Sequence, residues 1–143
     1  MLKHANPNLS REEVALMLRE YHITPTHQRI EIAHTLFSRC EHLSAEQIMA
    51  SVNLRHPEAS KATIYNTLKL FREKGLIREV IVDPSKVFYD PNTTPHHHFF
   101  NVESGELTDI HADAMQLSGL PQLPHGMVAD SVDIIVRIRP AAA

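Results

Sequence analysis

This chain of 143 residues lacks several features, and each absence excludes a class of protein. Cys40 is the only cysteine, which rules out an internal disulfide and a Cys-x-x-Cys zinc clip. No apolar run is long enough to span a bilayer, and the segment 1–4 lacks the apolar core of a signal peptide. We therefore expect a cytoplasmic protein with no membrane partner, in which Cys40 is a small apolar residue at a helix end.

Net positive charge is also lacking, since the formal charge is −3, which by itself argues against nucleic-acid binding. The distribution of charge changes that conclusion. Residues 1–90 hold twelve basic and eleven acidic side chains, whereas residues 91–143 hold two and six. Within 61–78, Glu73 stands among five basic residues: Lys61, Lys69, Arg72, Lys74 and Arg78. Such a patch is sufficient for phosphate contacts, although it also fits an ordinary solvated helix face.

Histidine, by contrast, is abundant, with eleven residues, and three of them are consecutive at 96–98. His96 and His98 are two positions apart, so on a β-strand both imidazoles point to the same face. Two neutral imidazoles make half of a site for a borderline divalent metal, and Asp90 and Asp109 stand on either side of them. We interpret this spacing as a metal site rather than a solvated histidine run.

The N-terminal half has the pattern of four helices. Ser10 and Glu13 form a capping box before a helix whose expected apolar side consists of Val14, Leu16, Met17 and Leu18. Thr24 and Pro25 are interpreted as the cap and the first residue of a second helix. A second capping box over 44–47 opens the third helix. Ser60 caps a fourth helix that runs to about Lys74, with Gly75 as its terminator.

The fourth predicted helix has two different faces. Helical spacing gives it a buried stripe of Ile64, Leu68 and Phe71 and a basic stripe of Lys61, Tyr65, Lys69 and Arg72. Thr63 and Asn66 lie near its start. A DNA-recognition helix has this composition, because apolar residues anchor it, cations meet phosphates, and short polar or aromatic side chains reach the bases. We expect Tyr65 and Asn66 to contact bases, and Lys61, Lys69 and Arg29 to contact phosphates or the minor groove.

Two strand-like segments, 76–82 and 86–90, follow this helix, with a turn at 83–85. Four helices followed by a hairpin are the pattern of a winged helix-turn-helix, in which the hairpin is the wing. The fold class expected is α+β, with a winged-helix DNA-binding domain at 1–90, a hinge at 91–95 and a small α/β domain at 96–143.

Several motifs in this order resemble the ferric uptake regulator (Fur) family. The segment 62–68, followed by Phe71 and by 75–77, is similar to the recognition helix of that family. Thr24-Pro25 with Gln28-Arg29 is similar to its second-helix entrance, and 42–46 to its histidine-Ser/Thr-Ala-Glu element. The histidine pair, followed by the segment 105–109, is similar to its sensory strand region. The resemblance covers about residues 10–138.

The resemblance implies one divalent metal per chain, held by five residues: His42, Asp90, His96, His98 and Asp109. The physiological ion would be iron or manganese, with zinc a plausible occupant of purified protein. His97 falls on the opposite strand face and is expected to be exposed or a helper ligand. The resemblance also implies double-stranded DNA with an AT-rich palindromic operator, a homodimer, and repression of metal-homeostasis genes.

The departures from the family pattern narrow the choice of branch. Asn101 and Ser104 occupy places where many members carry cysteines, so a structural zinc held by four cysteines is excluded. This loss, the His-His-His-Phe-Phe segment and the ending 132–139 most resemble the iron response regulator branch, in which the histidine segment is associated with haem. Haem at His96, His97 and His98 is thus possible. The peroxide-sensing branch competes, because it prefers aspartate at the position of Asp109.

Residues 96–143 would form the dimerisation and metal-sensing domain. We expect strands near 97–103 and 106–110, a short helix near 112–118, and a buried strand over 128–138. Two other functions stay open: a manganese- or zinc-responsive regulator of the same family and, remotely, a small metal-dependent enzyme with an open two-histidine, carboxylate site. The enzyme would leave the basic stripe of the fourth helix unexplained, and no general base stands out.

Overall fold

The computed structural model describes residues 6–39 and 41–142, so the expectation for Cys40 lies outside the described residues. The chain divides into two compact units, Met1–Thr93 and Thr94–Ala143. This division falls inside the predicted hinge at 91–95. Within the described part of the chain, no helix combines the length and apolarity needed to cross a membrane.

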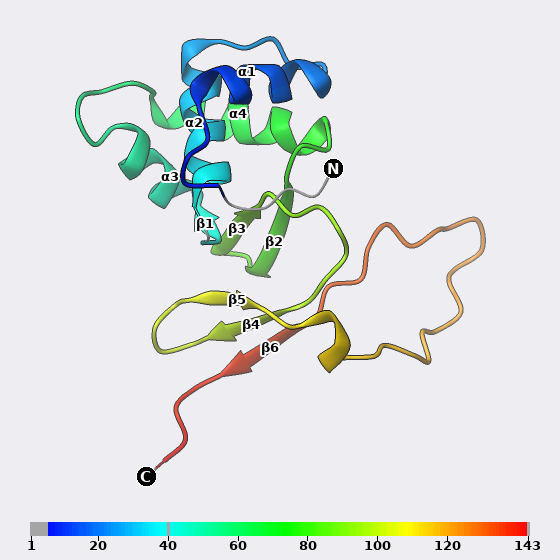
Figure 1. Cartoon of the computed structure of the whole chain (residues 1–143). Coiled ribbons are helices and arrows are strands. Elements are labelled where there is room, and N and C mark those ends of the chain that lie inside the picture. Colours follow the sequence, from blue (N-terminus) through cyan, green and yellow to red (C-terminus); the bar gives the residue numbers. More distant parts are fainter. Residues whose placement is uncertain (1–5, 40, 143) are drawn as a thin grey trace. The chain divides into compact units, whose positions relative to one another are not determined.

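The N-terminal unit begins with four helices, α1 (Arg11–Glu20), α2 (His27–Ser38), α3 (Ala45–Val52) and α4 (Lys61–Glu73) (Figure 1). Two predicted capping boxes are confirmed, at Ser10 for α1 and at Ser44 for α3. Ser60 caps α4 by accepting a hydrogen bond of 3.2 Å from the backbone N–H of Thr63. Gly75 follows α4 with a φ of 77°, a left-handed conformation that favours glycine.

The predicted start of the second helix is wrong by two residues. Thr26, and not Thr24, caps α2, because its hydroxyl accepts a hydrogen bond of 3.2 Å from the backbone N–H of Arg29. The Arg29 guanidinium donates to the Thr24 carbonyl at 2.9 Å. This bond holds Thr24 outside the helix and leaves Pro25 where its missing N–H has no cost.

The core of the N-terminal unit forms around the apolar stripe of α4. Ile64, Leu68 and Phe71 have no exposed surface, which confirms the predicted stripe. They belong to one cluster with apolar residues of the other helices: Val14, Leu18, Ile32, Leu36 and Ile48. Leu16 was expected on the buried side of α1 but is 60% exposed. The reason is helical geometry, since Leu16 lies about 200° around the axis from Val14.

A three-stranded antiparallel sheet completes this unit. The predicted hairpin consists of β2 (Arg78–Asp83) and β3 (Lys86–Asp90), paired with Val80 opposite Phe88. A third strand, β1 (Leu43–Ser44), pairs with β3 so that Leu43 lies opposite Tyr89. Two residues are too short to show a strand pattern in the sequence. This pairing extends the hairpin, the wing of a winged helix-turn-helix, towards the segment that precedes α3.

The C-terminal unit contains a second three-stranded sheet, in the order β5-β4-β6. Its strands are β4 (His98–Asn101), β5 (Leu107–Asp109) and β6 (Ile135–Ile138), with β5 antiparallel and β6 parallel to β4. The helix expected at 112–118 is only a 3-10 turn, η1, at Ala112–Ala114.

The prediction of a buried strand over 128–138 is wrong in two respects. The strand begins only at Ile135, and its apolar side chains are partly exposed, with 37% of Val136 and 38% of Ile138 accessible. The physical reason is the strand order, because β6 lies at the edge of its sheet and pairs with β4 alone.

Two leucine substitutions test the core of the N-terminal unit. Leu68→Ala should lower the free energy of unfolding by about 2–5 kcal/mol, because it removes a fully buried side chain of the α4 stripe. Leu16→Ala is the matched control on an exposed position and should change it by less than about 0.5 kcal/mol. Urea denaturation followed by circular dichroism measures both. Equal destabilisation of the two variants would contradict the assignment of the core.

Candidate metal centre and nucleic-acid interface

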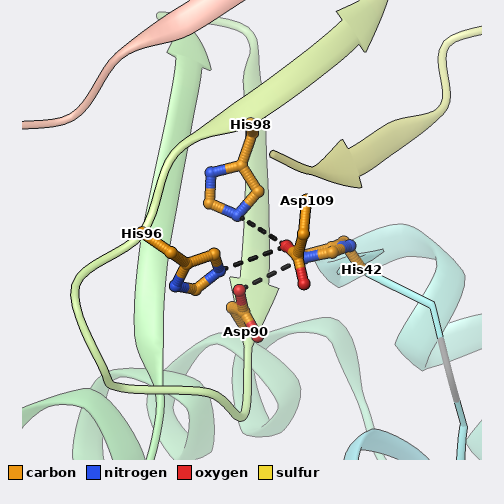
Figure 2. Close-up of side chains that lie close together, drawn as sticks. All are labelled: His42, Asp90, His96, His98 and Asp109. Atoms are coloured by element: carbon orange, nitrogen blue, oxygen red, sulfur yellow. Dashed lines mark hydrogen bonds and ion pairs between the residues drawn. The ribbon is translucent and has the colours of Figure 1, made fainter. Parts of the chain in front are cut away.

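In the C-terminal unit, two histidines lie beside one aspartate, one of them at the start of β4 and the other in the segment that precedes it. His98 is the first residue of β4, and Asp109, the last residue of β5, lies opposite it. The Nε2 atoms of His96 and His98 each lie 3.2 Å from the Asp109 Oδ1 atom (Figure 2). The two imidazole centroids are 4.4 Å apart. The His98 side chain is fully buried, whereas half of the Asp109 side chain is exposed, so the group has both a fixed and an accessible side.

The hydrogen bonding of His96 prepares it for a metal. Its Nδ1 atom lies 2.6 Å from the Thr94 carbonyl oxygen, which can only accept. The ring proton of a neutral His96 is therefore assigned to Nδ1, and the Nε2 lone pair faces the Asp109 carboxylate. A lone pair and a carboxylate oxygen repel each other unless a cation or a proton stands between them. Two imidazoles and a carboxylate thus fit a divalent ion of the iron, manganese or zinc type.

The N-terminal unit contains a second, smaller group, formed by His42 and Asp90. Their Nε2 and Oδ2 atoms are 3.2 Å apart, and both side chains are largely buried, with 12% and 6% exposed. The pairing of β1 with β3 positions them, because His42 precedes Leu43 and Asp90 follows its partner Tyr89. The other carboxylate oxygen of Asp90 accepts a hydrogen bond of 2.9 Å from the backbone N–H of Asn92.

The five predicted ligands therefore occur as a group of three in one unit and a pair in the other. Of the two expectations for His97, exposure is wrong, because its side chain is half-buried. Its Nδ1 atom accepts a hydrogen bond of 3.1 Å from the backbone N–H of Ile134. Its carbonyl accepts one of 2.9 Å from Ile110. His97 thus fastens β4 to the segment that leads into β6.

The face of α4 opposite the core carries most of the predicted DNA contacts. Lys61, Tyr65, Asn66 and Lys69 are all exposed there. Thr63 is half-buried, and its hydroxyl accepts a hydrogen bond of 3.0 Å from the capping hydroxyl of Ser60. The Thr63 side chain is therefore engaged in starting the helix. Arg29 is also half-buried, with its guanidinium bound to the Thr24 carbonyl as described above.

A partner of Tyr65 was not anticipated from the sequence. The Tyr65 hydroxyl donates to the Glu46 carboxylate on α3 at 3.2 Å, and the Lys61 ammonium lies 5.9 Å from the ring centroid. Desolvation, and then the negative charge of Glu46, raise the pKa of Tyr65, so its hydroxyl stays protonated at neutral pH. No sequence signal links residues 19 positions apart on different helices. The bond holds the aromatic ring in place on the exposed face of α4.

Comparison with known proteins identifies the family to which this chain, with its winged helix-turn-helix and two histidine-aspartate groups, belongs. The sequence pattern described as "Ferric uptake regulator family" matches residues 20–134. The chain belongs to this family. Among its relatives, the peroxide-responsive repressor PerR of Staphylococcus epidermidis is 33% identical over 100 residues, which are 70% of this chain and 67% of that protein.

Solved structures of the family share the fold. The Fur protein of Vibrio cholerae matches with a TM-score of 0.68 and 19% identity over 88% of this chain and 98% of its own. The Fur protein of Pseudomonas aeruginosa, solved with manganese, matches with a TM-score of 0.65 and 18% identity over 89% and 97%. At this identity the likeness concerns the fold alone, and it agrees with the α+β class predicted from the sequence.

Membership of the Fur family decides the general function. The protein is a metal-responsive, DNA-binding transcription regulator, and regulators of this family act as dimers. It is not an enzyme, so the remote alternative of a metal-dependent catalyst is set aside.

Substitutions on α4 test the predicted DNA interface. Tyr65→Ala should relax sequence preference by roughly 1–3 kcal/mol for each base that the ring no longer touches. Lys69→Ala should instead weaken binding to all sequences alike and lower the salt slope by about one, because it removes one phosphate contact. Fluorescence anisotropy against operator and random duplexes at several salt concentrations measures both.

Tyr65→Phe serves as the control, since it removes only the hydroxyl that binds Glu46. It should loosen the ring and relax preference less than Tyr65→Ala does. Unchanged discrimination between operator and random DNA in Tyr65→Ala would mean that α4 is not the reading element.

Proposed function

We propose that this chain is an iron-linked repressor of metal-homeostasis genes, in which five residues share one divalent ion per chain. The ligands would be His42 and Asp90 from the N-terminal unit and His96, His98 and Asp109 from the C-terminal unit. The observation that carries the proposal is that each unit holds part of a ligand set: an imidazole-carboxylate pair in one, and two imidazoles with a carboxylate in the other. Iron and manganese favour more nitrogen and oxygen donors than either group supplies alone.

Sharing one ion between the units would make the protein a switch. The bound ion supplies positive charge that both carboxylates stabilise, so it favours the arrangement of units in which both groups reach it. The protein contributes fixed ligand orientation. The Thr94 carbonyl holds the His96 ring, and the Asn92 backbone holds the Asp90 carboxylate. Such partners of metal ligands typically raise metal affinity.

The DNA-binding part of the proposal rests on α4. We propose that α4 enters the major groove of an AT-rich, roughly palindromic operator, one half-site for each subunit of a homodimer in the cytoplasm. Exposed Lys61, Tyr65, Asn66 and Lys69 support this orientation. A partner subunit would also cover apolar surface that β6 exposes in the single chain, including Val136 and Ile138.

A substitution of His42 tests whether the two groups share an ion. In His42→Ala some metal should remain bound by His96, His98 and Asp109, while operator affinity no longer responds to it. Metal titration by isothermal calorimetry and operator binding with and without manganese are the two measurements. His125→Ala, at an exposed histidine outside both groups, is the control and should behave as the parent. A His42→Ala protein whose operator affinity still follows metal would refute the shared site.

Peroxide sensing and haem sensing are two alternatives to sensing a divalent metal alone. Peroxide sensing is supported by the relatives named peroxide-responsive repressor and by an aspartate, not a glutamate, at Asp109. Haem sensing is supported by the consecutive His96, His97 and His98, although the Nδ1 atom of His97 is engaged by Ile134. A manganese- or zinc-responsive regulator would use the same five residues without either chemistry.

Two measurements, one by visible absorption and one by mass spectrometry, distinguish these functions. A haem sensor should give a visible absorption band on haemin titration that disappears when His96, His97 and His98 are all replaced by alanine. A peroxide sensor should instead gain one oxygen atom on His42 or His96 when the ferrous protein meets peroxide, detected by peptide mass spectrometry. Absence of both signals would leave divalent-metal sensing.

A further inference from the structure

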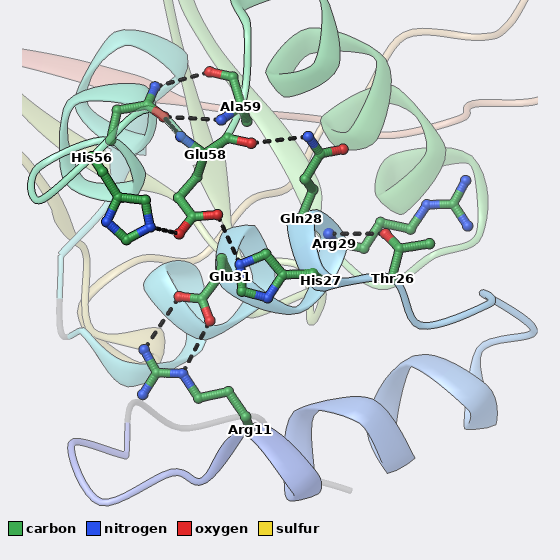
Figure 3. A network of polar contacts seen from close by, with 10 residues as sticks. Arg11, Thr26, His27, Gln28, Arg29, Glu31, His56, Glu58 and Ala59 are labelled. Atoms are coloured by element: carbon green, nitrogen blue, oxygen red, sulfur yellow. Dashed lines mark hydrogen bonds and ion pairs between the residues drawn. The ribbon is translucent and has the colours of Figure 1, made fainter.

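A second cluster of histidines lies within the N-terminal unit and shares no residue with the metal groups described above. Its centre is the Glu58 carboxylate, which contacts two imidazoles (Figure 3). The His27 Nε2 atom lies 2.7 Å from one carboxylate oxygen, and the His56 Nε2 atom lies 2.5 Å from the other. The three residues come from the first turn of α2 and from the segment between α3 and α4.

The backbone of Glu58 is held in place, whereas the two imidazoles around its carboxylate are exposed. The Glu58 backbone N–H donates to the Asn53 side chain at 2.7 Å, and its carbonyl accepts from the Gln28 amide at 2.9 Å. The Glu58 side chain is only 17% exposed. Both imidazole side chains are 68% exposed, so each ring can rotate towards a common point beside the carboxylate.

The charges around the cluster favour a cation. Glu31 lies one helical turn after His27 on α2, and both of its carboxylate oxygens accept hydrogen bonds of 3.2 Å from the Arg11 guanidinium. These hydrogen bonds are the main reason that the pKa of Glu31 is lowered, so it remains ionised. With neutral imidazoles, the two glutamates and one arginine leave one net negative charge. Arg11 engages Glu31, so Glu58, whose carboxylate contacts the two imidazoles, is the carboxylate that would bind a metal together with them.

We propose that His27, His56 and Glu58 bind a second divalent ion, of the borderline class that includes zinc. Two imidazoles and one carboxylate are a common zinc donor set with a position left for water, whereas magnesium and calcium prefer oxygen donors. In the imidazole-carboxylate contacts described above, a proton on each Nε2 atom faces a carboxylate oxygen. On binding, a neutral ring shifts that proton to Nδ1, or a charged ring releases it to solvent, and the Nε2 lone pair bonds to the metal.

The cluster lies where a bound ion would affect the start of α4. Residues 53–60 connect α3 to α4, and Ser60 at the end of this segment caps α4. An ion held by His27, His56 and Glu58 would tie that connection to the start of α2, and so fix where α4 begins. This stabilisation would act on the DNA-binding unit independently of the first ion, the one proposed to bind at His42 and Asp90 and at the histidines of the C-terminal unit.

Zinc titration of the full chain tests the proposal. His96→Ala/His98→Ala removes the main ligands of the first site, and one zinc equivalent per chain should remain by isothermal calorimetry. Adding His27→Ala/His56→Ala should abolish that equivalent. Adding His125→Ala, the exposed control histidine, should leave it unchanged. No remaining zinc in the first variant, or zinc that survives removal of His27 and His56, would overturn the second site.

Two further measurements distinguish the loss of a metal ligand from the loss of the folded structure. Glu58→Gln keeps the shape of the side chain and should weaken the remaining zinc by at least about tenfold, since even indirect partners of ligands cost that much. In the His96→Ala/His98→Ala background, cobalt bound in place of zinc should give a visible absorption band that the further change His56→Ala removes while the circular dichroism spectrum is unchanged. Because His42 and Asp90 are intact in every variant, the His42→Ala experiment judges the regulatory proposal separately.

Discussion

The complete burial of one face of α4 is the constraint on which the rest of the N-terminal unit depends. Ile64, Leu68 and Phe71 have no exposed surface, and residues of α1, α2 and α3 join them in one cluster. Burial of this face leaves the opposite face of α4 to solvent, and that is where Lys61, Tyr65, Asn66 and Lys69 lie. The interaction is apolar and carries no information about DNA. It nevertheless determines which side chains are available for DNA, because a helix with one buried side has one orientation in its core.

Strand pairing has the corresponding role for the predicted metal ligands. In the N-terminal unit the pairing of Leu43 with Tyr89 sets His42 beside Asp90, 48 residues away in the chain. In the C-terminal unit the pairing of β4 with β5 sets His98 opposite Asp109. In both units the backbone ladder brings an imidazole to a carboxylate before any metal is considered. The sheets therefore hold these polar groups together, and a metal ion would find its ligands preorganised.

Two carboxylates next to α4 show how the same structure could control the reading surface. Glu46 on α3 accepts the hydrogen bond of Tyr65, and Glu58 holds two imidazoles just before the cap of α4. Neither residue belongs to the apolar core, and each connects α4 or the segment before it to another helix. The ends and the aromatic side chain of α4 are therefore positioned by polar contacts, whereas its axis is positioned by packing. Changes in charge at these contacts would act on the reading surface without unfolding the unit.

Local rules acting on the sequence determined the helices, their caps at Ser10, Ser44 and Ser60, the buried stripe of α4 and the wing, because each depends on residues close together in the chain. The spacing of His96 and His98 likewise predicted that their imidazoles lie on one side, and both Nε2 atoms lie close to the Asp109 carboxylate. Tertiary structure alone decided the short strand β1, the Glu46–Tyr65 bond, and the Glu58 cluster, since these join segments that no periodicity connects. It also decided that Thr26 and not Thr24 caps α2, and that β6 is an edge strand with exposed apolar residues. Apolar residues in a sequence predict that a strand is buried. Whether other parts of the same chain bury it depends on the position of the strand in its sheet, which the sequence pattern does not give.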